Sequence, residues 1–193
     1  MNKEIEKWEE QEGVKFLRRI GLYANQAVLD FGCRVGHYTI PAAKIVGSNG
    51  IVYAIDTQQH ALKELRQKAK THNLTNIRII KTAGRMKLPL ESEEVDVILL
   101  YDVLHCLRKD KRTKLYHEAF RLLKQNGLLS VYPKHTAEDD PTMEFQHLHV
   151  SDIRQEIQNS GFSFDRKYFA TICHITAGTN QTPLESSERL TGK

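Results

Sequence analysis

The residues of this chain that could do chemistry begin with an acid followed by two spaced glycines. Asp30 lies near the end of the apolar run 27–31, and Gly32 and Gly36 follow it. Twenty residues beyond Gly36, Asp56 ends a second apolar run. In nucleotide-binding βαβ units a carboxylate at this place accepts hydrogen bonds from ribose hydroxyls, and the glycines form the turn before the helix. The spacing therefore predicts a strand, a glycine turn, a helix and a cofactor that contains a ribose.

A second group of candidate residues follows the apolar run 95–101. Tyr101, Asp102 and His105 lie together there, and an imidazole beside a carboxylate can move a proton at neutral pH. Parallel sheets present their ligands at the carboxyl ends of the strands. We therefore expect His105 to act as a base and Asp102 to orient it or to bind substrate. A second interpretation, in which His105 packs over the cofactor or caps the following helix, fits the sequence equally well.

Histidines and acids also gather in residues 134–149. Imidazoles and carboxylates suit zinc or manganese, but here their spacing is irregular and no cysteine pair accompanies them. We therefore expect a polar loop or lid over this segment, and no metal. The histidines are His135, His147 and His149, and the acids are Glu138, Asp139 and Asp140.

The cysteines are few and odd in number. Cys33, Cys106 and Cys173 favour a reducing cytoplasm over a disulfide-bonded secreted protein. Cys33 and Cys106 lie near the predicted cofactor, which raises thiol or metalloid chemistry, although a free buried cysteine is the commoner state. The chain carries no apolar stretch of the roughly 20 residues that a membrane helix needs and no apolar signal region. A cytoplasmic location is expected.

Composition is that of a globular domain. The chain has 193 residues, of which 40% are hydrophobic and 27% charged, with a formal net charge of +4. The densest basic run, residues 108–114, begins a predicted helix and is read as a solvated face in preference to a nucleic-acid patch.

Apolar runs and helical patterns alternate along the chain, which predicts a doubly wound, mostly parallel sheet with helices on both faces. Thr57 is placed to cap the second of the helices that follow strands. The expected strands are 27–31, 51–56, 76–80, 95–101 and 128–132, with a long strand candidate over 162–175. The expected helices are 4–19, one after Gly36 that stops at Gly47, 58–72, one that ends before 126–127, and 151–160.

Four segments in order resemble motifs I, post-I, II and III of class I S-adenosylmethionine-dependent methyltransferases. They are VLDFGCRVGHYT, VYAID, VDVILLYDVLH and LLKQNGLLSVYP, and the branch is that of type 11 and quinone C-methyltransferases. The similarity runs from about Gly13 to Ile175. It implies one Rossmann-like domain over residues 1–178, with the leading helix over the cofactor and a polar tail over 179–193.

The resemblance also implies that S-adenosyl-L-methionine is the cofactor and that Asp56 holds its ribose. Arg34 stands where the family has a glycine, and Gly84 lies where the family often has an acid for the adenine. We expect an open site, with Arg34 at a negative φ and its side chain directed outward. The implied cofactor residues are Asp30, Gly32, Cys33, Arg34, Gly36, Tyr38, Asp56, Thr57, Gly84, Arg85 and Tyr101.

Three functions are compatible with these features. The first is methyl transfer to a small molecule, which we expect. The second is methylation of RNA or protein, and the turn after strand 95–101 lacks the Asn/Asp-Pro-Pro-Tyr sequence of enzymes that methylate amide or adenine nitrogens. The third is a binding protein that kept the fold and lost the chemistry. Because little sequence follows Ile175, we expect the segment 162–175 either to end the sheet alone or to bend on itself into two short strands. The family's seventh strand should then be absent or rudimentary, and we expect a homodimer to form through this end.

Overall fold

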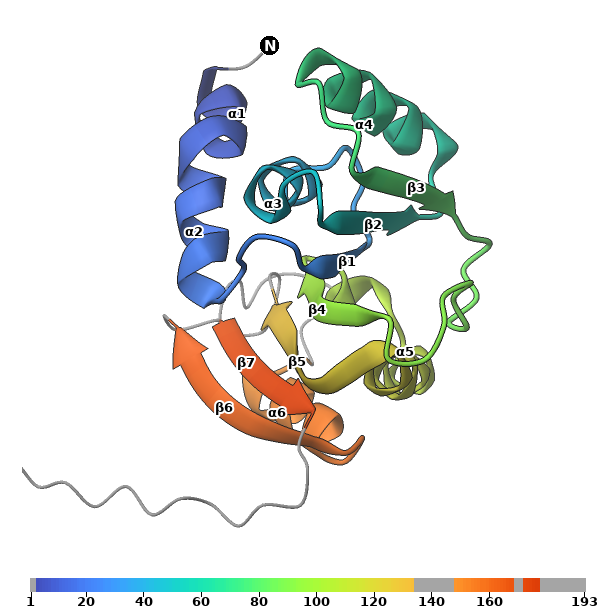
Figure 1. Ribbon diagram of the computed structural model, residues 1–193. Helices are drawn as coiled ribbons and strands as arrows, with labels where there is room; N and C mark the ends of the chain where they lie inside the picture. The colour runs from blue at the N-terminus through green and yellow to red at the C-terminus, as the bar shows by residue number, and fades with distance from the viewer. Residues whose placement is uncertain (1–2, 134–147, 169–171, 178–193) are drawn as a thin grey trace, which may run out of the picture.

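A seven-stranded sheet runs through the computed structural model, which describes residues 3–133, 148–168 and 172–177 (Figure 1). Its strands are β1 (Ala27–Phe31), β2 (Ile51–Asp56), β3 (Ile77–Lys81), β4 (Val95–Tyr101), β5 (Leu123–Tyr132), β6 (Phe162–Tyr168) and β7 (Ile172–Ala177). They lie in the order β3-β2-β1-β4-β5-β7-β6. β1 to β5 are parallel, and β7 is antiparallel to both β5 and β6.

Helices cover both faces of this sheet, as predicted (Figure 1). They are α1 (Lys3–Lys7), η1 (Trp8–Glu12), α2 (Gly13–Ile20), α3 (Thr39–Val46), α4 (Gln59–Thr71), η2 (Leu104–Cys106), α5 (Lys109–Leu122) and α6 (Val150–Gln158). On one face Leu17 of α2 and Ala42 of α3 belong to the same core cluster as Val28. On the other face Leu115 of α5 packs in the cluster of Leu29. Neighbouring residues of β1 thus serve opposite layers, as the alternation of a strand requires.

The most apolar strand lies in the middle of the sheet. β4 pairs with β1 on one side and with β5 on the other, and all of its residues except Asp96 are buried. A strand covered on both faces can be apolar throughout because neither face meets water. The carboxyl ends of β1, β2 and β4 therefore meet at one edge, which is where the sequence places the candidate residues.

The leading helix predicted over residues 4–19 is present as α1, η1 and α2 in succession. Its middle is a π-helical turn, in which the N–H of Gly13 donates to the carbonyl oxygen of Trp8. A Cβ on Gly13 would lie 2.9 Å from that oxygen, so the turn depends on the glycine. The ring of Trp8 contacts those of Phe16 and Tyr38. The helix thus packs on the body of the protein through aromatic side chains.

The expectation that the seventh strand is absent or rudimentary is wrong. The long segment after α6 forms two strands, and β7 has six residues, Ile172–Ala177. Its register runs along both neighbours, with Ile175 opposite Leu129 of β5 and opposite Phe164 of β6. The physical reason is that the segment turns back on itself, so it supplies the sixth and the seventh strand from one run of sequence.

Two local expectations also differ from the structure. Thr57 does not cap α4: Gln58 is the N-cap residue, and its N–H donates to Oδ1 of Asp56 at 2.8 Å. β5 begins at Leu123, well before the expected start at Leu128. It does so because Leu123 pairs with Val95, and a register shift accommodates the intervening residues.

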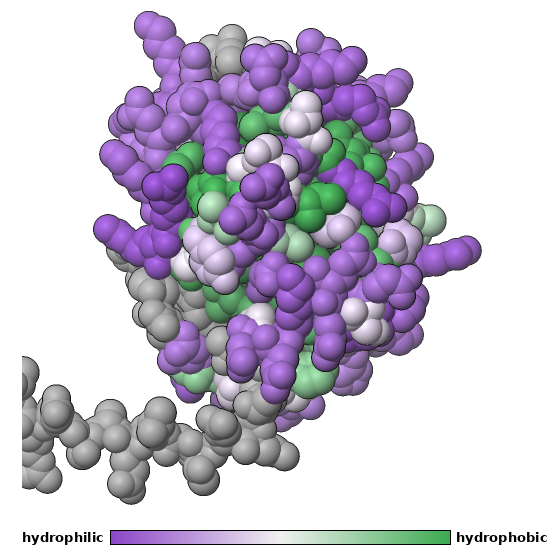
Figure 2. Space-filling view, viewed as in Figure 1, coloured by the Kyte–Doolittle hydropathy of each residue, from purple (hydrophilic) through white to green (hydrophobic). Residues whose placement is uncertain are grey.

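Polar side chains cover most of the surface in the view of Figure 2, with apolar residues showing between them. Within the described ranges, no helix has the length and apolar character needed to cross a membrane. Of the predicted lid at 134–149, the structure describes only residues 148–149. The rest of the lid, with His135 and His147, and the predicted tail at 179–193 lie outside the described residues. Among the residues that are described, no group of three or more His, Cys, Asp or Glu side chains could hold a metal ion.

Candidate functional site

A cavity of about 490 Å³ opens at the carboxyl ends of β1, β2 and β4. The predicted site residues in its wall are Gly32, Arg34, Asp56, Thr57, Gly84, Asp102 and His105. The glycine turn, the acid after β2 and the turn after β4 therefore meet around one space, although more than 70 residues separate Gly32 from His105 in the sequence. A cavity of this size is typical of small-molecule and cofactor sites.

Asp56, the last residue of β2, is an acid in the wall of this cavity. Its Oδ2 accepts the N–H of Arg34 at 2.9 Å, and its Oδ1 accepts the N–H of Gln58 at 2.8 Å. Asp56 is 8% exposed and lines the cavity. Because each carboxylate oxygen can accept two hydrogen bonds, one acceptor position remains on each. Asp56 can thus bind a pair of hydroxyls while it holds the glycine loop to the start of α4.

The glycine loop leaves β1 with its backbone turned toward β2. The N–H groups of Gly32 and Cys33 both donate to the carbonyl oxygen of Ile55, at 2.8 and 3.1 Å. Gly32 and Gly36 have φ values of +78° and +87°, which favour glycine. A Cβ on Gly36 would overlap the side chain of Leu65. A Cβ on Gly32 would lie 2.9 Å from Cγ2 of Val103. Both glycines are therefore required by conformation and by space, and the crowding is more severe at Gly36.

Arg34 differs from the expectation, because its φ is +45° and not negative. An L-residue in this left-handed region carries a strain of about 1 kcal/mol. The hydrogen bond from its N–H to Asp56 holds the backbone in place. Arg34 is exposed and lines the cavity, which remains open beside it. The position thus has a backbone conformation that favours glycine and adds a cation to the wall.

Several predicted cofactor residues lie outside the cavity wall that the described residues form. These are Asp30, Cys33, Gly36, Tyr38, Arg85 and Tyr101. Asp30 is buried and accepts a hydrogen bond from Oγ1 of Thr39 at 2.5 Å, which ties β1 to the start of α3. Burial raises the pKa of Asp30 to about 6. The hydroxyl of Tyr101 is buried, and it lies 2.7 Å from Oγ of Ser130.

The two cysteines near the glycine loop have different surroundings. Cys33 is 6% exposed and packs in an apolar cluster with Ile40 and Leu62, and burial strongly raises the pKa of its thiol. Cys106 is exposed and lines the cavity. Burial of its thiol and the charge of Asp102 raise the pKa of Cys106, and these outweigh the charge of Arg34, which lowers it. Both thiols are therefore protonated at neutral pH.

His105 lies between an acid and a thiol in the turn after β4. Its Nδ1 is 3.7 Å from Oδ1 of Asp102, and its Nε2 is 3.1 Å from Sγ of Cys106. Asp102 has a φ of +54°, and its N–H donates to the carbonyl oxygen of Tyr132 at 3.0 Å. This turn, continued by the short helix η2, brings all three side chains to the cavity wall. The distance from Nδ1 to Oδ1 is longer than a hydrogen bond, and both side chains line the cavity, where an imidazole can exchange a proton with a bound molecule.

The cavity also includes residues that the sequence reasoning did not assign to the site. They are Phe31, Ile55, Gln58, Thr82, Met86, Val103, Leu107 and Lys111. Phe31 and Ile55 adjoin predicted residues at strand ends, so strand adjacency was a usable signal for them. Met86 and Lys111 lie in a loop and on a helix, and no spacing rule points to them.

Residues 28–127 match the family model described as Methyltransferase domain. A demethylmenaquinone methyltransferase of Geobacillus stearothermophilus is 31% identical over 84 residues, which cover 44% of this chain and 36% of that protein. An uncharacterized protein of Haemophilus influenzae is 30% identical over 109 residues, covering 56% of this chain and 43% of that protein. The chain spans half or less of the length of the curated relatives it matches.

The fold has close counterparts among solved structures. A SAM-dependent methyltransferase from Aquifex aeolicus superposes with a TM-score of 0.72 at 25% identity, over 88% of this chain and 90% of that one. Its match includes nearly the whole of both chains, whereas the sequence relatives match in part. The family model, which covers more than half of the residues, and this fold together show that the chain belongs to the class I S-adenosylmethionine-dependent methyltransferase family.

Proposed function

We propose that this chain transfers a methyl group from S-adenosyl-L-methionine to a small-molecule acceptor. The observation that carries the proposal is Asp56, whose carboxylate lines the cavity with one acceptor position left on each oxygen. A pair of vicinal ribose hydroxyls fits two such acceptors. The curated relative from Geobacillus stearothermophilus, by its name, acts on demethylmenaquinone, which supports a small-molecule acceptor.

The residues present fit this cofactor. Gly32 leaves the backbone open to close approach, Asp56 would hold the ribose, and Met86 and Val103 give apolar surface in the same wall. Arg34 would pair with the carboxylate of the methionine part, since a guanidinium binds carboxylates with two hydrogen bonds. When bound, the cofactor supplies a sulfonium methyl that is displaced in line. The protein's task is then to align the acceptor and to exclude water.

Asp102 and His105 are proposed to act on the acceptor. An acceptor that is a hydroxyl, an amine or a carbon acid must lose a proton, and His105 lies in the cavity wall where it could take one. Asp102, 3.7 Å from His105 Nδ1, would stabilise the imidazolium that results.

Among the proposed cofactor residues, Gly84 has φ +73° with open space around it. The adenine would therefore be held there by backbone and apolar contacts.

Titration of the wild type with S-adenosylhomocysteine tests the cofactor site, and we expect micromolar affinity. Arg34→Gly should change two quantities in opposite directions. Glycine relieves the positive φ and should raise the free energy of unfolding by about 1 kcal/mol, whereas loss of the guanidinium should weaken binding by about tenfold. Calorimetry and denaturant unfolding measure both. Binding that is seen only in Arg34→Gly would instead favour the alternative that this chain is a binding protein that kept the fold and lost the chemistry.

Mass spectrometry of a small molecule that copurifies with the protein would identify the acceptor. An RNA acceptor is the alternative, and the salt dependence of binding distinguishes it, because affinity for a phosphate backbone falls steeply as the salt concentration rises. Strongly salt-dependent RNA binding would contradict the proposed acceptor class.

A homodimer through the C-terminal edge of the sheet stays a prediction. β6 is the outermost strand on this side, and an edge strand offers unpaired backbone groups that a second copy can pair with. We expect solution scattering to give twice the mass of the 22.2 kDa chain. A monomer mass that holds across the concentration range would rule out the dimer.

A further inference from the structure

The leading helix carries an acid that is almost completely buried. The side chain of Glu9 is 1% exposed, although it lies in the charged stretch Lys3–Glu12 of an N-terminal helix. Glutamate is very rarely buried to this extent unless it is paired. Replacing a buried ion pair by apolar residues is often neutral or stabilising, so stability alone explains such a residue poorly.

Glu9 lies in the π-helical turn η1. Gly13 allows the wide turn because it has no Cβ to meet the carbonyl of Trp8. Within this turn Glu9 is buried and Trp8 is half-buried, whereas Glu10 is exposed. The indole Nε1–H of Trp8 donates to the carbonyl oxygen of His37 at 2.9 Å. Turns of this type recur at functional sites.

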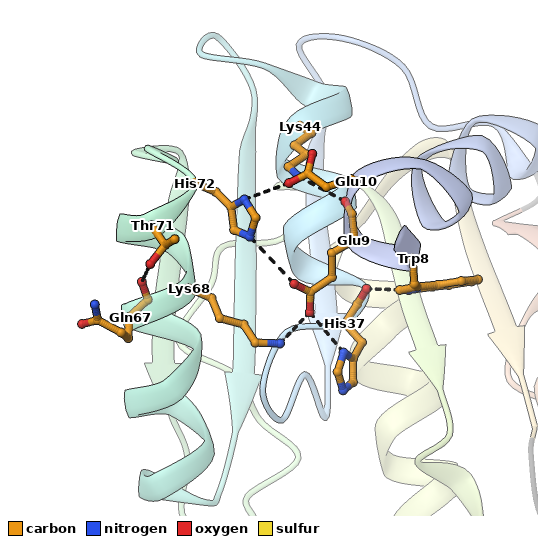
Figure 3. Close-up of polar contacts among 9 residues, drawn as sticks. All are labelled: Trp8, Glu9, Glu10, His37, Lys44, Gln67, Lys68, Thr71 and His72. Atoms are coloured by element: carbon orange, nitrogen blue, oxygen red, sulfur yellow. Dashed lines mark hydrogen bonds and ion pairs between the residues drawn. The ribbon is translucent and has the colours of Figure 1, made fainter. Parts of the chain in front are cut away.

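The carboxylate of Glu9 faces three cationic or titratable groups (Figure 3). Its Oε1 accepts a hydrogen bond from Nζ of Lys68 at 2.5 Å and lies 3.2 Å from Nδ1 of His37. Its Oε2 is 3.8 Å from Nε2 of His72. Burial raises the pKa of Glu9, but the hydrogen bonds and charges of His37 and Lys68 outweigh it and leave the pKa below its usual value. Glu9 is therefore an anion at neutral pH.

His37 connects this carboxylate to the cofactor loop. It directly follows Gly36 and lies two residues before Thr39, whose hydroxyl binds Asp30. The leading helix thus holds His37 at two points, its carbonyl through Trp8 and its imidazole through Glu9. The other end of the loop is fixed by the bond from Arg34 to Asp56.

Glu10 lies in the same turn as Glu9, and the side chains with which it pairs lie outside the glycine loop. It is 44% exposed, and its Oε1 lies 2.6 Å from Nζ of Lys44 and 3.0 Å from Nδ1 of His72. These partners belong to α3 and to the end of α4. Glu10 therefore anchors the helix to its neighbours. Glu9 shares that role through Lys68 and His72, and through its backbone carbonyl, which accepts a hydrogen bond from Nζ of Lys44 at 3.2 Å.

We propose that Glu9 is a positioning residue for the cofactor: from the buried side of the π-turn it holds His37, and through His37 the end of the glycine loop, in the conformation that receives the methionine part of S-adenosylmethionine. This role rests on the proposed function. It gives a reason for the buried charge beyond its pairing with Lys68 and His72, because replacing a buried ion pair by apolar residues is often neutral or stabilising. His37 is the intermediary, and Lys68 balances the charge of Glu9.

The test compares Glu9→Gln with Glu10→Gln, which removes a charge from the same turn. S-adenosylhomocysteine affinity is measured by calorimetry well below the melting temperature. Glu9→Gln should weaken it by about tenfold, the size expected for one charge-assisted hydrogen bond, and Glu10→Gln by less than about twofold. In a His37→Ala background, Glu9→Gln should cause no further loss of affinity, while its effect on the melting temperature through Lys68 persists. Equal losses from the two glutamine variants, or the same loss with His37 absent, would overturn the proposal.

Hydrogen exchange of the cofactor-free protein provides a readout that does not depend on binding. Glu9→Gln should speed exchange of the amides in residues 36–40 several-fold relative to Glu10→Gln. Unchanged exchange would overturn the role of Glu9 whatever the affinity. A wild type that fails to bind S-adenosylhomocysteine would overturn the proposed function and the cofactor part of this inference, and the exchange result would then decide by itself whether Glu9 holds the loop.

Discussion

Replacement of Asp56 by alanine should weaken S-adenosylhomocysteine binding by about a hundredfold or more. Two charge-assisted hydrogen bonds to the ribose are worth about 1.5 to 3 kcal/mol each, and both are lost. The substitution also removes the acceptor for the N–H groups of Arg34 and Gln58, which loosens the loop that faces the cofactor. Titration calorimetry measures the affinity, and circular dichroism checks that the sheet is intact.

Asp96 supplies the matched control for this experiment. Like Asp56 it accepts a backbone N–H, that of Ala27 at 2.7 Å, and it also binds Nζ of Lys124 at 2.9 Å. It lies near the start of β4, at the opposite end of the strands from the cavity. Asp96→Ala should therefore lower stability without a change in affinity. If Asp56→Ala bound within about threefold of the wild type, Asp56 would not hold the ribose.

Gly36→Ala should lower the free energy of unfolding by about 2 to 5 kcal/mol. A left-handed φ of +87° costs an L-residue about 1 to 2 kcal/mol, and crowding in a packed interior adds about 1 to 3 kcal/mol. The crowding arises because the new Cβ would overlap the side chain of Leu65, which is fully buried. Denaturant unfolding of the cofactor-free protein measures the change.

Gly84→Ala separates the two contributions. Gly84 has a similar φ of +73°, but no atom lies within 4 Å of the place where its Cβ would be. This variant should lose about 1 kcal/mol, from backbone strain alone. Equal losses at Gly36 and Gly84 would mean that Leu65 moves aside freely, and the close packing of the loop on α4 would then have no energetic weight.

The parallel sheet and the acids of its edge could be predicted from local patterns. The strand bounds of β1, β2 and β4 follow from apolar runs in which Asp30 and Asp96 are the only internal polar residues, because strands that are buried on both faces have no polar alternation to blur their ends. Asp56 follows from its position at the end of such a run. Gly32 and Gly36 follow from the need for positive φ in the turn. These features depend on a few neighbouring residues, so the linear sequence contains them.

Other features depend on contacts between distant segments, and only the tertiary structure decided them. The sequence alone does not distinguish the surroundings of Cys33 from those of Cys106. In the structure Cys33 packs against α3 and α4, whereas Cys106 lines the cavity. Glu9 looks like one more solvated acid, because its burial comes from a π-turn and from side chains that lie 28 to 63 positions further on. Arg34 takes a glycine-like φ because a distant carboxylate holds its N–H. β7 is a full strand because β5 and β6 lie on both sides of it to complete its hydrogen bonds.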